Sequence, residues 1–178
     1  MKKLLTLALV ACAFIATPTL TAQEFTVDKS PMDQASFPTD YKKANKQIKV
    51  TYSRPQLKGR DLETLAPSGK VWRMGANEAV EVTLYKDMKL GTTPVKAGTY
   101  TMYAIPGATE WTVIVSKDLN VWGSYFYNEA NDVARISVPV EKGEESVEYF
   151  GMEFVEVDKG AHLVGAWGTA RIQIPFYN

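Results

Sequence analysis

The stretch from Arg54 to Ala79 holds the side chains of this sequence that are best suited to binding a ligand. Its three arginines carry planar guanidinium groups that bind carboxylate, sulfate or phosphate through paired hydrogen bonds. An amide and a carboxylate follow closely and could orient a ligand that bears hydroxyl groups. The candidate ligand-binding residues are Arg54, Arg60, Trp72, Arg73, Asn77 and Glu78.

A structural role for the same side chains is the alternative. The arginines could pair with nearby carboxylates and attach an irregular loop to the rest of the domain, while Asn77 fixes a turn. The carboxylates available for this are Asp61, Glu63, Glu78 and Asp132. The sequence leaves both interpretations open.

Aromatic side chains near loops are a second possible binding feature, because an exposed ring can stack on a sugar or a peptide. These residues are Trp72, Trp122, Tyr125 and Tyr127. Phe126 alternates with Tyr125 and Tyr127, which suggests that one face of this segment is buried. Core packing is therefore the favoured interpretation, and Trp111 and Trp167, on apolar strand faces, are also expected in the core.

Catalysis has weaker support. Four acids could pair as in a glycosidase, namely Asp61, Glu78, Glu110 and Asp132. His162 is the single histidine, it lies on the polar side of its segment, and no Gly-x-Ser-x-Gly motif accompanies it. The one cysteine, Cys12, precedes the expected domain. We therefore expect no metal site and no cofactor, and the catalytic residues of any hydrolase remain unknown.

The elements that would position these residues are strands. Apolar side chains alternate with polar ones, which is the period of a half-buried strand. The apolar positions fall within residues 48–52, 80–84, 100–104, 111–115, 134–138, 150–154, 163–167 and 172–176. Turn signals separate them, among them Pro106-Gly107 and Lys142-Gly143. These features predict an all-β fold, an antiparallel β-sandwich or flattened barrel of about eight strands, with one long polar insertion.

The N-terminus has the layout of an export signal. Lys2 and Lys3 precede an apolar run from residue 4 to 16, and small and polar residues follow. We expect a signal peptide over residues 1–22, an extended lead-in over 23–47 and the β-sandwich domain over 48–178. The run is too short to span a membrane, so no transmembrane segment is expected. Lipid attachment at Cys12 is the alternative, and it would give a membrane-anchored lipoprotein instead of a periplasmic or extracellular protein.

Charge excludes one class of partner. The chain has 20 basic and 20 acidic residues, and loss of Lys2 and Lys3 with the signal would leave 18 against 20. A protein that binds nucleic acid needs a concentrated basic surface to neutralise phosphates. We therefore expect no nucleic-acid partner.

Several separated motifs resemble a secreted bacterial domain family of unknown function, DUF2911. They are Ser30 to Asp33, Tyr52 to Pro55 with Lys58 to Arg60, Gly69 to Arg73, Gly75 to Ala79, Ala97 to Tyr100, and Trp122-Gly123 with Tyr125 and Tyr127. The resemblance covers nearly all of the chain after the signal. It implies a secreted location, mostly in Bacteroidetes, and it implies no activity.

A rigid sheet that carries one long polar loop is a common way to mount a binding site. We therefore expect a non-enzymatic exported protein that binds a small polar or anionic ligand, possibly derived from a glycan, through the Arg54 to Ala79 loop. A carboxylate-dependent hydrolase and a structural or interaction protein of the cell envelope are the alternatives.

Overall fold

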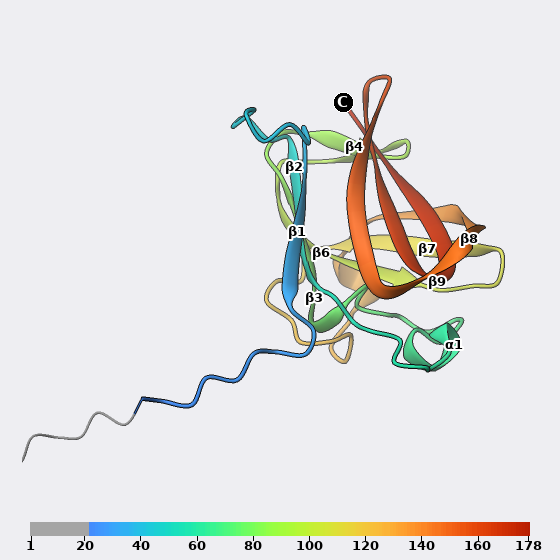
Figure 1. Cartoon of the computed structure of the whole chain (residues 1–178). Helices are drawn as coiled ribbons and strands as arrows, with labels where there is room; N and C mark the ends of the chain where they lie inside the picture. Colours follow the sequence, from blue (N-terminus) through green and yellow to red (C-terminus); the bar gives the residue numbers. More distant parts are fainter. Residues whose placement is uncertain (1–21) are drawn as a thin grey trace, which may run out of the picture.

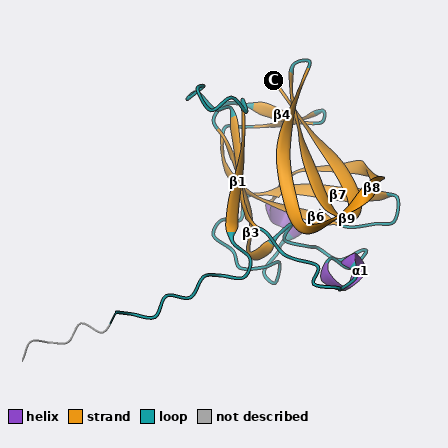
Figure 2. Cartoon of the chain, viewed as in Figure 1, coloured by secondary structure: helices purple, strands orange, loops and turns teal. Residues whose placement is uncertain are grey.

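The computed structural model describes residues 22–178, so Cys12 and residues 1–21 of the expected signal peptide lie outside the described residues. Nearly all of the regular structure is β (Figure 2). The elements are β1 (Met32–Phe37), β2 (Ile48–Ser53), α1 (Leu62–Leu65), β3 (Ala76–Leu84), β4 (Met88–Leu90), β5 (Thr93–Val95), β6 (Gly98–Ile105), β7 (Glu110–Ser116), the 3₁₀ turn η1 (Glu129–Asn131), β8 (Asp132–Val157) and β9 (Gly160–Tyr177).

The strands form one open antiparallel sheet in the order β1-β2-β3-β6-β7-β8-β9-β4-β5. The long strand β8 joins two halves of this sheet, since residues 132–139 pair with β7 and residues 140–157 pair with β9. Figure 1 shows β1 to β3 facing the red and orange strands β8 and β9 across the interior. The predicted all-β sandwich is confirmed, and its sheet is not closed into a barrel.

The core fills the space between the two halves. Alternate residues of β2, β3 and β6, such as Val50, Val82 and Met102, are fully buried because their side chains point to the same inner face. An aromatic cluster lies at the centre, in which Trp72 stacks on Trp167 at 5.4 Å and meets Trp111 edge-on at 5.7 Å. The prediction that Trp111 and Trp167 belong to the core is confirmed.

The sequence pattern located most strands but not all of their bounds. It missed β1, which lies inside the expected lead-in, and the short strands β4 and β5. It also divided β8 and β9 into two strands each. Lys142-Gly143 lies inside β8, where the pairing with β9 changes register between Lys142 and Val147. The turn signal there marks an irregularity of a continuing strand.

The Arg54 to Ala79 segment is attached to the sheet at several points. Gln56 forms an isolated antiparallel bridge with Tyr149 of β8, and Trp72 forms another with Ala104 of β6. Since Trp72 is also only 4% exposed, this segment is anchored in the core through its own indole ring. Among residues 22–178 no helix has the length and apolar character that crossing a membrane requires.

Candidate functional site

A bulge in β3 creates the hollow that we consider the candidate site. Thr51 of β2 pairs with Glu81 of β3, but Ser53 pairs with Ala76, so four residues of β3 stand opposite Tyr52 alone. Bulges of this kind occur often beside functional sites, because they redirect side chains. Asn77, within the bulge, has φ of 60°. Asparagine tolerates this left-handed conformation better than most residues do.

The bulge separates residues 77–79 from β2 and pairs them with a different segment. Ala79 N donates to Val121 O, and Gly123 N donates to Asn77 O, each at 3.0 Å. Glu78 and Trp122 are thereby directly opposite each other. In an antiparallel pair such partners project to the same side, and they are closest where, as here, the hydrogen bonds flank them.

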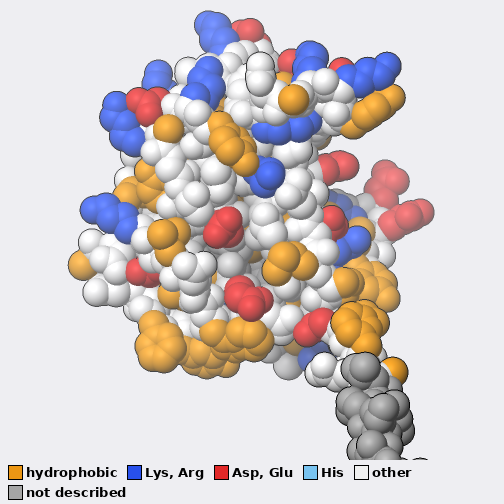
Figure 3. Space-filling view, turned by 90° about the vertical axis from the view of Figure 1, so that its left-hand side faces the viewer, with side chains coloured by type: hydrophobic (Ala, Val, Ile, Leu, Met, Phe, Trp, Pro, Cys, Tyr) orange, Lys and Arg blue, Asp and Glu red, His pale blue; other side chains and the backbone are white. Residues whose placement is uncertain are grey.

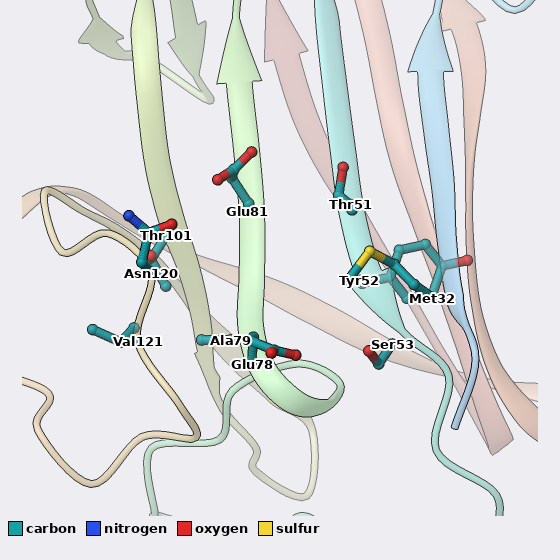
Figure 4. Close-up of a pocket in the computed structure, with 10 residues that line it drawn as sticks. All are labelled: Met32, Thr51, Tyr52, Ser53, Glu78, Ala79, Glu81, Thr101, Asn120 and Val121. Atoms are coloured by element: carbon teal, nitrogen blue, oxygen red, sulfur yellow. The ribbon is translucent and has the colours of Figure 1, made fainter. Parts of the chain in front are cut away.

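The hollow between β2, β3, β6 and residues 120–121 has a volume of about 280 Å³ (Figure 4). Thr51, Glu81 and Thr101 form a row across its three strands, because Glu81 pairs with each threonine. Figure 4 also shows Glu78 and Ser53 pointing toward one another from β3 and β2. The polar residues of the lining are Thr51, Ser53, Glu78, Glu81, Thr101 and Asn120.

Close backbone packing fixes the position of Ser53. A side chain at Gly75 would place its Cβ 3.0 Å from the carbonyl oxygen of Ser53, so glycine allows this approach. Ser53 is 4% exposed, and its hydroxyl has no hydrogen-bond partner among residues 22–178. Thr101 is also buried, but its hydroxyl donates to the carbonyl of Asp118 at 2.6 Å. Ser53 thus offers a free hydroxyl to the hollow.

Exposed aromatic rings lie beside the hollow. Trp122 is 56% exposed, and Tyr125 and Phe126 are more exposed still. The expectation of core packing is wrong for Trp122 and Tyr125, and Phe126 is exposed as well. Residues 123–126 form turns rather than a strand, so no alternation of buried and exposed side chains applies there. Figure 3 shows acidic side chains in the middle of one face of the molecule and apolar side chains gathered along its lower edge.

Tyr127 belongs instead to a polar network beneath this segment. Its hydroxyl donates to Asp132 Oδ2 at 2.7 Å and accepts from Arg135, and its ring packs edge-on against Tyr103. Burial, with a contribution from the Asp132 hydrogen bond, raises the pKa of Tyr127 to about 12. The pKa of Tyr103 also rises to about 12, mainly through burial and secondly through the charge of Asp118. Asp132 Oδ2 therefore binds both Tyr127 and Arg135, the latter at 2.7 Å.

Arg54 lies on the opposite side of β2, at a seam between the two halves of the sheet. Its Nε donates to the carbonyl of Phe150 in β8 at 3.1 Å, and its guanidinium lies 3.5 Å from Asp33 and over the ring of Tyr149. The neighbouring Tyr52 hydroxyl accepts from Met152 N at 2.8 Å. These side chains bridge β2 and β8.

Arg60 and Arg73 lie in two further places. Arg60 donates to the carbonyls of Gln56 and Leu57 and borders a separate surface hollow. Arg73 follows the buried Trp72 and makes no ion pair with the described residues. Burial lowers the pKa of the Arg73 guanidinium, and this is partly opposed by the nearby hydroxyl of Tyr125. The arginines therefore do not converge on one pocket.

Of the six candidate residues, only Glu78 lines the hollow. Asn77 builds the bulge, and its amide donates to Asp28 Oδ2 at 3.3 Å. Trp72 is in the core. The sequence reasoning missed Ser53, Glu81, Thr101 and Asn120, since alternating polar residues of a strand look like any solvated face. The one sequence feature that could have indicated the bulge is Gly75-Ala76-Asn77, because glycine and asparagine directly before an alternating strand pattern favour an irregular backbone.

The fold and the hollow define a class of protein, an all-β fold with one open antiparallel sheet and a polar hollow on the outer face of that sheet. The chain belongs to the family described as protein of unknown function (DUF2911), whose model matches residues 30–176. No curated protein and no solved structure gave a significant match.

Proposed function

We propose that this protein binds a saccharide in the hollow between β2, β3 and β6, without transforming it. The observation that supports this most strongly is the combination of two carboxylates, Glu78 and Glu81, with hydroxyl groups in one concave surface beside the exposed Trp122. Small-molecule sites are concave and carry a few convergent polar groups of this kind.

A sugar ring fits these groups chemically. Carboxylates accept hydrogen bonds from sugar hydroxyls, whereas the Ser53 and Thr51 hydroxyls can both donate and accept. The C–H face of a pyranose ring is apolar and packs well on an indole. Trp122 projects to the same side as Glu78, so both could contact one ring.

Thermal unfolding in the presence of mono- and oligosaccharides tests the proposal, because a ligand that binds only the folded state raises Tm. We expect the shift to be lost in Glu78→Gln and in Trp122→Ala. The matched controls are Glu156→Gln, an exposed glutamate of β8, and Tyr41→Ala, a ring that is 86% exposed. Equal shifts in all four variants, or no shift with any saccharide, would contradict the proposal.

A carboxylate-dependent hydrolase is the second candidate function, because Glu78 and Glu81 line the same hollow. Glycoside hydrolysis uses two such carboxylates on either side of the bond that breaks. Release of the aryl group from aryl glycosides should then vanish in both Glu78→Gln and Glu81→Gln while both variants stay folded. Absence of turnover in the wild type excludes this candidate for the substrates assayed.

We also propose that the protein is exported. The layout of residues 2–22 supports cleavage after Ala22 and a periplasmic or extracellular location. Mass spectrometry of the mature N-terminus in its native host tests this, since an N-terminus at Gln23 is expected. An N-terminus at a lipid-modified Cys12 would support membrane anchoring instead.

A further inference from the structure

We infer that the ligand of this hollow carries a protonated amine, and that an amino sugar with a free amino group binds more tightly than the corresponding neutral or acidic sugar. The inference rests on the proposed function and specifies the ligand class of the same site. It concerns the electric charge of the hollow.

The hollow holds negative charge that the protein leaves uncompensated. Glu78 and Glu81 both line it, and no lysine or arginine does. Neither glutamate takes part in any of the four ion pairs between described residues. Asp28, bonded to Asn77 at the edge of the bulge, adds a third carboxylate nearby. Two carboxylates that share one concave surface make the local electrostatic potential more negative and raise the local concentration of cations.

The arginines of the preceding segment do not offset this charge in the lining. Arg54 bonds to Phe150 and Asp33 on the other side of β2. Arg73 is not among the residues that line the hollow. Ser53, Asn120 and the two threonines, which are the other polar residues of the lining named above, are neutral.

Ser53 is an independent sign that the hollow takes a ligand. The residue is 4% exposed, and its hydroxyl points toward Glu78 in Figure 4 without a hydrogen bond to any residue of 22–178. Because this hydroxyl opens to the hollow, a group bound between Ser53 and Glu78 can form a hydrogen bond with it. An amine of a sugar can donate to both oxygens at once.

A protonated amine gains more from these residues than a hydroxyl does. Hydrogen bonds between an ammonium group and a carboxylate are shorter and stronger than those between neutral groups. Trp122, opposite Glu78, can add a cation–π contact to the same group. An acidic sugar would instead place its carboxylate against Glu78 and Glu81, and repulsion would weaken its binding.

Calorimetric titration with four matched sugars tests the inference, namely glucosamine, N-acetylglucosamine, glucose and glucuronate. At about pH 6 the amine of glucosamine is protonated and the carboxyl group of glucuronate is ionised. We expect glucosamine to bind at least about tenfold more tightly than N-acetylglucosamine, which has the same ring without the charge. Raising the salt concentration should weaken the binding of glucosamine more than that of glucose.

Glu78→Gln and Glu81→Gln should each reduce the preference for glucosamine, and Glu156→Gln should leave it unchanged. If the wild type binds N-acetylglucosamine and glucose as tightly as glucosamine, the inference fails while the proposed function stands. If glucuronate binds most tightly, the inference fails in the opposite direction, and Arg73→Ala should then abolish that binding. If no sugar binds, both the inference and the proposed function fail.

Discussion

Glu78 and Trp122 face each other as a directly opposed pair in a short ribbon that is separate from the main ladder of the sheet. The ribbon exists because the bulge of β3 releases residues 77–79 from β2. It places a carboxylate and an exposed indole on the same side, next to the hollow.

Asn77→Val should destabilise the bulge. Asn77 has φ of 60°, and a β-branched side chain in this region costs about 1–3 kcal/mol of folding free energy. Asn77→Gly is the matched control, since glycine adopts the same conformation without strain. Urea unfolding should show the loss for valine and little change for glycine. Equal losses would mean that the amide bond to Asp28, which both variants lack, matters more than the backbone.

Tyr52→Phe should lower the free energy of unfolding by about 1–3 kcal/mol, because it leaves the N–H of Met152 without its acceptor at 2.8 Å in a buried place. Tyr85→Phe, at a ring that is 51% exposed, should have almost no effect. Chemical denaturation of both variants measures the difference. A Tyr52→Phe protein as stable as the wild type would show that the seam between β2 and β8 does not depend on this hydroxyl.

Arg54→Ala should cost more stability than Arg60→Ala. Arg54 joins β2 to β8 through the Phe150 carbonyl and also contacts Asp33 and Tyr149, whereas Arg60 bonds only to carbonyls three and four residues before it. We expect about 1–2 kcal/mol for Arg54 and less than about 0.5 kcal/mol for Arg60. Chemical denaturation measures both costs, because a shift of the midpoint at an unchanged m-value reports a change in the free energy of unfolding. A larger cost at Arg60 would contradict the structural role assigned to Arg54.

Alkaline pH should weaken the network around Tyr127. Its pKa is raised from 10.0 to about 12, so the folded state holds the phenolic proton more tightly than the unfolded state does. This stabilisation is fully present below pH 10 and is lost as the pH rises through about 12. The free energy of unfolding should fall between pH 10 and about 12, and it should fall by less in Tyr127→Phe than in the wild type. Ultraviolet absorbance measures tyrosine ionisation, and the difference between the wild type and Tyr127→Phe gives the contribution of Tyr127. If Tyr127 ionises over the same pH range as the exposed tyrosines, the expectation is contradicted.

The fold was predictable from the sequence where burial imposes a period of two. Val80, Val82 and Leu84 alternate because one face of β3 packs on the core, and the same holds for most other strands. Strand β1 escaped detection because it lies at the edge of the sheet, where only Ala35 and Phe37 of its six residues are buried. A strand that is held mainly by backbone hydrogen bonds and buries few side chains shows little alternation of apolar and polar residues in its sequence.

The candidate site was predictable only in part. Glu78 was identified as a candidate because it lies in a long polar segment, but Glu81 and Ser53 read as ordinary polar positions of strands. Their convergence depends on the register shift between Thr51 and Ser53, and a register shift arises from the pairing of two distant segments. The arginines drew attention by their chemistry, yet their carbonyl and carboxylate partners come from β1, β8 and the loop itself.

Amide chemical shifts mapped by NMR while glucosamine is added to the protein test most directly whether the hollow binds this sugar. We expect saturable changes confined to residues around the hollow, including Thr51, Ser53, Glu81 and Trp122, and we expect these changes to be lost in Glu78→Gln. Changes centred on the hollow at Arg60 or on the Arg54 seam would contradict this expectation, and so would an unchanged spectrum at saturating sugar.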